Sequence, residues 1–308
     1  MKKNDTLLLT GSTGFVGKSF LNFLETIPRR HLPGKLILVS RQNPIKRQYS
    51  FENEVEVIRI ESDLRKPWDF EFNVSHILNL AADGSSDSYT NEAGMDFVMI
   101  GKNLSRSIKL CRPKVVVHAS SGACFGIKVI GETKNNLTKD KSVFIKSRLE
   151  SEECISIVCK ESGIRNVIAR LFTFIGPELL SKKQYAVSSF INDAVFKNSI
   201  NITGNKNTVR SYMNESTMSL WLYKCLINSQ VKNTISIGSS IPVTIEILAK
   251  FISKETGAPV NYVNSDVPGD YYVANNTREK QILKVSEGVD WQQSVRQCIE
   301  LLESRKSG

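Results

Sequence analysis

The sequence lacks the cysteine and histidine patterns that build metal sites or disulfide frameworks. Six cysteines are spread along the chain without a C-x-x-C pair, and only three histidines are present. We therefore expect no metal and no disulfides, and a cytoplasmic, reducing setting. No apolar run approaches the length of a membrane span, and Met1–Lys3 leads into a strand-like run rather than a signal sequence. Hence we expect no membrane partner.

Concentrated charge of one sign is also missing. The formal net charge of +10 raises the possibility of nucleic-acid binding. However, the basic residues occur in scattered short pairs, such as Lys2-Lys3 and Arg29-Arg30, and no aromatic residues interleave with them. We therefore expect no nucleic-acid partner. The positive charge is interpreted as a solvated surface that attracts anionic small molecules.

What is present is a glycine-rich turn near the start of the chain. The apolar run Leu7–Thr10 precedes three glycines spaced three apart, and a helix-compatible run from Lys18 to Leu24 follows. Glycine permits positive φ and close approach of the backbone to a pyrophosphate, and the first amides of the helix then face the phosphate charge. A dinucleotide fingerprint requires this strand–turn–helix context. The expected cofactor-binding residues here are Gly11, Ser12, Thr13, Gly14, Phe15, Val16 and Gly17.

Apolar, β-branched segments alternate with helical patterns through the first half of the chain. This alternation predicts an α/β fold with a doubly wound parallel sheet over residues 1–173, and a strand near 234–238 that could return to it. Residues 174–308 mainly form a smaller C-terminal lobe that binds substrate. The expected strands are Leu7–Thr10, Leu36–Ser40, Val55–Ile60, His76–Ala81, Lys114–Ser120 and Val167–Arg170. The expected helices are Phe15–Thr26, Asn91–Cys111 and Val143–Ser162.

Residues that follow the second strand indicate which dinucleotide is bound. Ligands of such sheets bind at the carboxyl ends of the strands. Ser40 and Arg41 occupy the place where an acidic residue would bind the adenosine ribose hydroxyls. An arginine instead suits a ribose phosphate, with Ser40 as an additional donor, so we expect NADP, with NAD as the other possibility. Alternatively, Arg41 is a solvated loop charge.

Three further strand ends carry candidate residues. Asp63 and Leu64 follow the third strand, where a carboxylate could reach an adenine amino group. Small side chains end the fourth strand and leave room for a cofactor, or simply pack well; the residues expected at the cofactor are Leu80, Ala81 and Ala82. Ser120 and Ser121 end the fifth strand, where hydroxyls could bind a reacting oxygen. His118, inside that strand, is interpreted as a core histidine.

Together these motifs resemble the extended short-chain dehydrogenases/reductases that modify nucleotide sugars, namely epimerases, dehydratases and 4-keto reductases. The resemblance spans nearly the whole chain and implies a Rossmann-type fold. The segments that carry it are the glycine turn, Asp63-Leu64, Asn79–Ala82, Ser120–Gly126, Arg170–Pro177, Arg210–Met213 and Tyr271–Arg278. It implies a nucleotide-sugar substrate bound by Thr173, Tyr185, Arg210 and Arg278. It also implies a homodimer through the helices Asn91–Cys111 and Val143–Ser162.

The resemblance breaks at the reaction centre. The family uses a tyrosine as proton shuttle and a lysine four residues later that holds the nicotinamide ribose, both on one helix face. Phe144 and Arg148 stand at these positions. Phe144 cannot exchange a proton, whereas Arg148 could still bind a ribose. Ser121 matches the family's active-site hydroxyl, and Gly122 and Ala123 replace the acidic pair of the dehydratases, which disfavours 4,6-dehydration.

The sequence leaves three explanations open. Another residue, such as Tyr185 or Cys124, takes over proton transfer in an NAD(P)-dependent nucleotide-sugar epimerase or 4-keto reductase. Alternatively, the protein binds NADP(H) or a nucleotide sugar without turnover, as a partner or regulator. Thirdly, the sequence is an altered variant. We rank the divergent enzyme first because the segment around Arg210 resembles an intact substrate motif.

Overall fold

The chain folds into two compact units. The computed structural model describes residues 1–41, 46–67, 72–82, 90–126, 128–129, 139–263 and 268–307. Unit 1 comprises Met1–Cys124, Leu137–Leu171 and Ser219–Ile235, and unit 2 comprises Phe125–Asn136, Phe172–Met218 and Ser236–Gly308. The chain therefore passes between the units several times.

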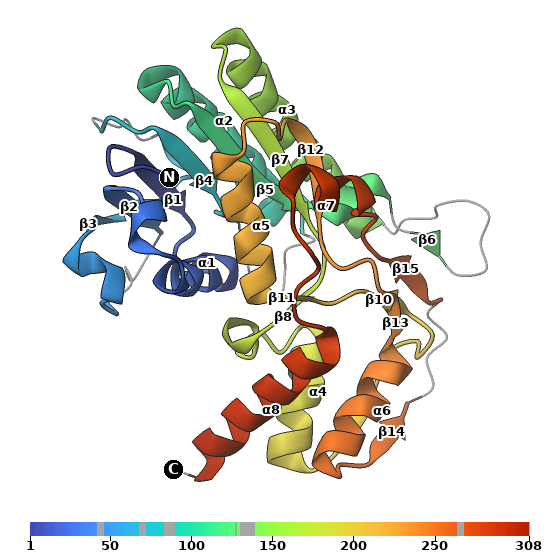
Figure 1. The fold of residues 1–308 in the computed structure, drawn as a ribbon. Coiled ribbons are helices and arrows are strands. Elements are labelled where there is room, and N and C mark those ends of the chain that lie inside the picture. The colour runs from blue at the N-terminus through green and yellow to red at the C-terminus, as the bar shows by residue number, and fades with distance from the viewer. Residues whose placement is uncertain are drawn as a thin grey trace. The chain divides into compact units, whose positions relative to one another are not determined.

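Unit 1 is built on a seven-stranded sheet with the order β12-β7-β5-β4-β1-β2-β3 (Figure 1). Its strands are β1 (Thr6–Thr10), β2 (Lys35–Ser40), β3 (Glu56–Glu61), β4 (His76–Asn79), β5 (Val115–Ser121), β7 (Arg165–Leu171) and β12 (Asn233–Ile237). Each neighbouring pair from β7 to β3 is parallel. The strand order reverses between β1 and β4, which is the kind of position where ligands bind in doubly wound sheets. The expected fold class is confirmed.

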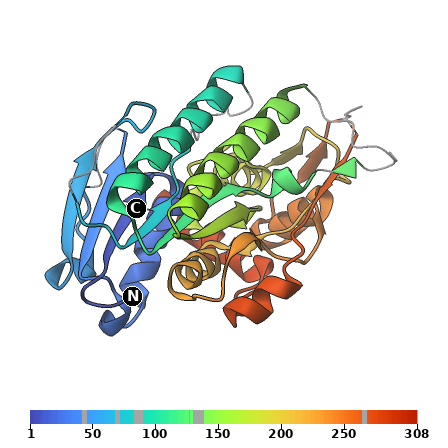
Figure 2. The same ribbon diagram turned by 90° about the horizontal axis from the view of Figure 1, so that it is seen from above.

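Long helices cover the sheet of unit 1. In Figure 2, α2 (Asn91–Cys111) and α3 (Lys139–Glu161) lie side by side over one face. Alternate strand residues point toward them, because successive side chains of a strand face opposite sides. The resulting core contains Leu8, Ile37, Ile77 and Val116 from the strands, Ile100, Leu104 and Ile108 from α2, and Ile155, Val158 and Cys159 from α3. Helix α1 (Phe15–Thr26) follows β1 through the glycine turn.

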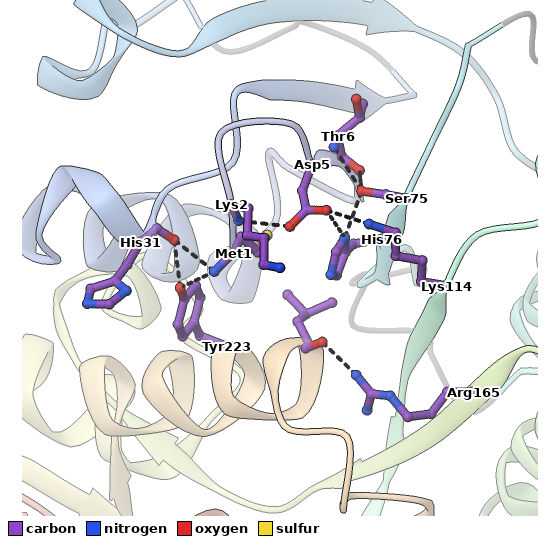
Figure 3. A network of polar contacts seen from close by, with 11 residues as sticks. Met1, Lys2, Asp5, Thr6, His31, Ser75, His76, Lys114, Arg165 and Tyr223 are labelled. Carbon is purple, nitrogen blue, oxygen red and sulfur yellow. Dashed lines mark hydrogen bonds and ion pairs between the residues drawn. The ribbon is translucent and has the colours of Figure 1, made fainter.

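A polar network ties the amino-terminal ends of the strands together (Figure 3). Buried Asp5, just before β1, accepts hydrogen bonds from the Lys2 amide at 2.8 Å and from Lys114 Nζ at 2.9 Å. Arg165, at the start of β7, donates to the carbonyl of Cys225 at 2.8 Å. Cys225 lies in α5 (Glu215–Ile227). These bonds fix the edge of the sheet opposite to the one where ligands are expected.

Unit 2 consists of helices and short strands. Its helices are α4 (Ala186–Lys197), α6 (Ile245–Thr256), α7 (Thr277–Leu283) and α8 (Trp291–Ser307). Its strands are β6 (Lys128–Val129), β8 (Phe174–Ile175), β9 (Ile200–Ile202), β10 (Val209–Arg210), β11 (Met213–Asn214), β13 (Val243–Thr244), β14 (Val260–Tyr262) and β15 (Asp270–Tyr272). One sheet has the order β13-β10-β15-β6, and β11 pairs with β8 and β14 with β9. Across the described ranges of both units, every helix falls short of the length or apolar character that crossing a membrane requires.

Candidate functional site

The glycine turn between β1 and α1 has geometry that side chains would disrupt. Gly11 has φ +69°, and a Cβ there would lie 2.6 Å from the carbonyl oxygen of Leu80. A Cβ on Gly17 would collide with the carbonyl oxygen of Gly11. A left-handed conformation and close backbone packing are both conditions that glycine satisfies. The observed conformation of the turn therefore requires glycine at positions 11 and 17.

The first turn of α1 suits an anion. Its N-cap is Gly14, so no side chain caps the helix, and no acidic residue lies in the first turn. The amides at a helix start carry partial positive charge and favour a phosphate. Ser12 is buried, and its hydroxyl donates to the carbonyl of Val39 at 3.3 Å. Ser12 thus anchors the turn to β2, while the exposed Gly14 and partly exposed Thr13, Phe15 and Val16 remain on the ligand side.

The end of β2 contains a buried hydroxyl that needs a partner. Ser40 is 4% exposed, and its Oγ makes no hydrogen bond within the described residues. An unsatisfied buried hydroxyl costs about 1–3 kcal/mol, so such a group marks a position that a ligand can complete. Arg41 follows it and is exposed. This pair fits a hydroxyl or phosphate on a ribose.

Asp63, after β3, is held by an arginine that the sequence analysis did not single out. Arg65 donates from Nε to Asp63 Oδ1 at 2.9 Å and from Nη2 to Oδ2 at 2.8 Å. Hydrogen bonds from Arg65 lower the pKa of Asp63 to about 2. Leu64 packs in the core of unit 1. The only sequence signal for this pairing is the spacing of two residues between the opposite charges.

The end of β4 lies against the glycine turn. The Leu80 amide donates to the carbonyl of Thr10 at 3.2 Å, and the Ala81 amide donates to Asn79 Oδ1 at 3.3 Å. Leu80 and Ala81 are partly exposed and Ala82 is exposed. Small side chains beside the turn leave space for a ligand at this edge of the sheet.

His118 belongs to a buried chain of hydrogen bonds. Because the Ala81 amide identifies Asn79 Oδ1 as an acceptor, Asn79 Nδ2 donates to His118 Nδ1, at 2.7 Å. His118 Nε2 then carries the proton and donates to Ser151 Oγ at 3.4 Å. Burial, with a smaller effect of nearby Arg148, lowers the pKa of His118 to about 3. The imidazole is a neutral core group, as expected, and not an acid catalyst.

The two serines that end β5 differ in their surroundings. Ser120 is buried and donates to Glu152 Oε1 at 2.5 Å, and Arg170 binds both oxygens of the same carboxylate at 3.0 and 2.7 Å. Ser121 is partly exposed and accepts from the Ala123 amide at 3.2 Å. Burial and the charge of Glu152 raise the pKa of the Cys124 thiol to about 11. Cys124 is therefore protonated near neutral pH and unsuited to act as a base.

Phe144 and Arg148 face each other on α3, as their spacing predicts. The Arg148 guanidinium carbon lies 4.7 Å from the centre of the Phe144 ring and 3.4 Å from the centre of the Phe97 ring. Arg148 is 9% exposed, and Phe97 comes from α2. Cation–π contacts of this kind offset part of the cost of burying the charge. Lys146 is exposed.

Arg210, in unit 2, forms an ion pair. Within the described residues, its hydrogen bonds all come from Nη1, which donates to the carbonyl of Val209 at 2.9 Å and to the Asp270 side chain. Its guanidinium lies 5.8 Å from the centre of the Tyr272 ring. The pairing with Asp270 was not foreseen, because the two residues are sixty positions apart and meet only through β10 and β15.

The remaining residues expected at the substrate also lie in unit 2. The carbonyl of Thr173 accepts from the Met213 amide at 3.1 Å, and the Thr173 side chain is partly exposed. Tyr185 is the N-cap of α4 and is 39% exposed. Arg278 is exposed in the first turn of α7. These side chains are accessible to a ligand within unit 2.

The parallel sheet, its glycine turn and the open helix start define a doubly wound protein of the dinucleotide-binding class. The chain belongs to the NAD-dependent epimerase/dehydratase family, whose model matches residues 7–216. The resemblance stated from the sequence motifs is confirmed at the level of the family. A search of curated proteins by sequence finds no significant match.

Solved structures of two nucleotide-sugar enzymes and of a protein in complex with a nucleotide sugar share the fold. MoeE5, solved with UDP-glucose and NAD, superposes with a TM-score of 0.77 and 19% identity, over 98% of this chain and 99% of that chain. The UDP-N-acetylglucosamine 4-epimerase of Methanobrevibacter ruminantium M1 superposes with a TM-score of 0.80 and 18% identity, over 99% of this chain and 100% of that chain. The dTDP-glucose 4,6-dehydratase of Bacillus anthracis strain Ames, solved with NAD, superposes with a TM-score of 0.80 and 15% identity, over 98% of each chain. At these identities the likeness establishes the fold.

Proposed function

We propose that this protein binds a nicotinamide dinucleotide in unit 1 and a nucleotide sugar through unit 2, and acts as an epimerase or 4-keto reductase of the sugar. The observation that carries the proposal is the uncapped, glycine-enforced turn from Gly11 to Gly17 at the reversal of strand order. Residues at the neighbouring strand ends fit the same ligand. Of the three proteins cited above, two are named as nucleotide-sugar enzymes and MoeE5 was solved with UDP-glucose; two of the three structures contain NAD.

The proposed cofactor is NADP(H) in preference to NAD(H). The buried Ser40 hydroxyl, which makes no hydrogen bond to any described residue, and the exposed Arg41 guanidinium together offer a neutral donor and a charged donor to a ribose phosphate. Calorimetric titration of both reduced dinucleotides tests the preference. Arg41→Ala should weaken NADPH binding about ten- to a hundredfold and NADH binding little, since one charge-assisted hydrogen bond is worth about 1.5–3 kcal/mol. Equal loss for both cofactors would refute the role of Arg41.

The proposed substrate contact is between Arg210 and the diphosphate. Because Arg210 uses Nη1 for its bonds to the protein, Nε and Nη2 remain as a fork for phosphate oxygens. Thr173, Tyr185 and Arg278 are proposed to contribute further contacts. Titration with UDP-, dTDP-, GDP- and CDP-sugars identifies the nucleotide.

Two arginine variants separate phosphate binding from general charge. Arg210→Ala should reduce nucleotide-sugar affinity about tenfold or more, from the loss of a charge-assisted pair. Arg296→Ala is the matched control, because Arg296 forms an exposed ion pair with Glu255 in the same unit. Equal effects of the two variants would refute the assignment.

The proposed chemistry assigns Ser121 to the sugar carbonyl oxygen and Arg148 to the ribose of the cofactor. When bound, the nicotinamide supplies and accepts hydride. The partly exposed Ser121 hydroxyl can donate to that oxygen. Phe144 cannot move a proton, Cys124 is held protonated and His118 is held neutral, so the partly exposed phenol of Tyr185 is the proposed source of the proton. Its substitution by Phe should abolish turnover and preserve dinucleotide binding.

The second candidate function is binding of both ligands without turnover, and it rests on the same absence of a suitable acid or base at Phe144, Cys124 and His118. With Phe144, Cys124 and His118 unsuited to proton transfer, the protein could bind both ligands without converting them. Absorbance of the reduced nicotinamide, followed with each nucleotide sugar that binds, separates the two candidates. Binding of both ligands without turnover would assign a regulatory or partner role.

The proposed assembly is a homodimer in a reducing cytoplasm. All six cysteines are free in the structure, which fits such a compartment. The outward face of α2 and α3 exposes apolar side chains that a second copy would cover, namely Met95, Met99, Leu110, Leu149 and Ile157.

A further inference from the structure

Arg65 forms a bridge between two carboxylates at the ligand edge of unit 1. Besides its bonds to Asp63, it donates from Nη1 to Asp96 Oδ2, on α2, at 3.0 Å. The Arg65 and Asp63 side chains are 39% and 22% exposed, and Asp96 is 28% exposed. The bridge is thus accessible to a ligand. Both oxygens of Asp63 receive hydrogen bonds from Arg65, which leaves little capacity for another donor.

This bridge lies beside the position proposed for the ribose phosphate. Strands β2 and β3 are parallel neighbours in which Ser40 pairs with Glu61, and the Ser62 amide donates to the carbonyl of Ser40 at 2.9 Å. Arg41 and Asp63 therefore follow adjacent strand ends. The positive charge of Arg41 adds, after Arg65, to the lowering of the Asp63 pKa. Asp63 is accordingly a permanent negative charge next to Arg41.

A bare carboxylate at this place would repel a phosphate. Like charges within several ångströms at a partly exposed site oppose each other by an amount that changes binding by about tenfold. Without Arg65, Asp63 and Asp96 would present two negative charges near Arg41 that no ion pair within the described residues would balance. Glu61, on β3, is a further exposed carboxylate. Its charge is the same with and without Arg65, so it does not contribute to the difference between the two cases. Arg65 removes most of this conflict because it is bonded to both aspartates.

We propose that Arg65 is a specificity-determining positioning residue that masks Asp63 and so permits a phosphate on the adenosine ribose. Its effect is on the choice between NADPH and NADH, and it acts through Asp63 rather than by binding the phosphate. The proposal rests on the dinucleotide function proposed above.

Calorimetry with NADPH and NADH at low ionic strength tests the proposal on the full chain. The ratio of the two dissociation constants is the readout, because any contact of Asp63 with adenine affects both cofactors equally. Arg65→Ala should shift the ratio about tenfold against NADPH, while NADH binding, retained, shows that the site is folded. Adding Asp63→Asn to Arg65→Ala should restore the ratio to within about twofold.

The control is Arg29→Ala, which removes the same charge from an exposed ion pair with Glu54, beyond the opposite end of α1. It should leave the ratio unchanged. An unchanged ratio in Arg65→Ala would overturn the proposal, as would an equal loss of both cofactors. A shift that Asp63→Asn does not reverse would show Arg65 to be a direct phosphate ligand, which also overturns it. If the wild type binds neither cofactor, the dinucleotide function itself fails.

Discussion

The contact between Phe144 and Arg148 shows what a single spacing can reveal. Two residues four apart on a helix share a face, so their proximity follows from the sequence. The contact with Phe97 does not follow from the sequence, because Phe97 reaches the guanidinium from another helix, α2. Its ring is nevertheless the closer of the two. The sequence therefore predicted the pair but not the second aromatic ring. Arg148 is thus a buried cation in contact with two aromatic rings.

Introducing a tyrosine at position 144 and a lysine at position 148 tests whether the remaining site is intact. The double variant Phe144→Tyr with Arg148→Lys places a phenol and an ammonium group on the same helix face. Since a positioned acid or base contributes about 10²–10⁴-fold, we expect at least a hundredfold gain in nicotinamide-dependent turnover of a bound nucleotide sugar. Nicotinamide absorbance under saturating substrate measures it.

Ser121 provides the matched control for that experiment. Ser121→Ala in the double variant should remove most of the gain, because the hydroxyl is proposed to bind the reacting carbonyl oxygen. A brisk wild-type rate that Ser121→Ala leaves intact would contradict the assignment of both Ser121 and the helix pair. Proton transfer would then occur at other residues.

Glu287 is a second residue whose role only the structure reveals. It accepts hydrogen bonds from Ser239, Ser240, Asn276 and Lys280, and so joins the segment after β12 to α7. Burial alone would raise its pKa, but these donors outweigh burial and lower the pKa to about 2.

Glu287→Gln should destabilise unit 2 at neutral pH. The loss of several charge-assisted hydrogen bonds is expected to cost about 1–3 kcal/mol of unfolding free energy. Because the folded pKa is depressed, the wild-type advantage is present above the unfolded value near 4.5 and disappears as the pH falls toward 2. Urea unfolding of both proteins at several pH values measures the difference. A constant difference down to pH 2.5 would contradict the prediction.

At the scale of elements, long periodic segments were predictable and short ones were not. Helices α1 and α2 have the expected bounds, and the strands of the parallel sheet differ from expectation by a few residues at most. Helix α3 begins at Lys139 rather than Val143, because its first turn is polar and shows no apolar period. Strands of two residues, such as β6 and β10, are too short to show an alternation of apolar and polar residues. Only their pairing partners define them.

The exposed faces of α2 and α3 lead to a prediction about assembly. Met95, Met99 and Leu110 lie on one stripe of α2, since their spacings are four, eleven and fifteen residues. Leu149 and Ile157 lie on one stripe of α3, eight residues apart. Leu149→Glu should convert the proposed dimer into a monomer, because a charge would have to be buried in the interface. Light scattering after size exclusion measures the mass.

A substitution on another surface controls for general effects of the added charge. Ile247 is similarly exposed, on α6 of unit 2, so Ile247→Glu should leave the mass unchanged. A monomeric wild type, or a Leu149→Glu variant that remains dimeric, would contradict the assignment of the interface to these helices.

At the scale of the whole molecule, the fold was more predictable than its electrostatics. The order of strands and helices follows from local patterns, and the parallel sheet follows from their alternation. The titration behaviour of His76 and His118 cannot be predicted from local patterns, because it depends on burial by distant parts of the chain. Burial lowers the pKa of His76 to about 4 against the opposing effect of Asp5, and lowers that of His118 to about 3. For the same reason, the sequence singled out Asp63 and Arg210 but not their ionic partners, Arg65 and Asp270.

The two buried histidines predict loss of stability in mild acid. Both have folded pKa values below the unfolded value of about 6.5, so below pH 6.5 the unfolded chain binds protons that the folded chain does not. Each histidine then lowers the unfolding free energy by at most about 1.4 kcal/mol for each pH unit of acidification, and the pair lowers it by about 2–2.5 kcal/mol per unit between pH 6 and 4.5. Urea unfolding across this range measures the slope. His118→Gln should reduce the slope by about half, even where the variant is less stable overall. A wild-type slope near zero in this range would show that these imidazoles bind protons in the folded protein, and that their burial does not exclude charge.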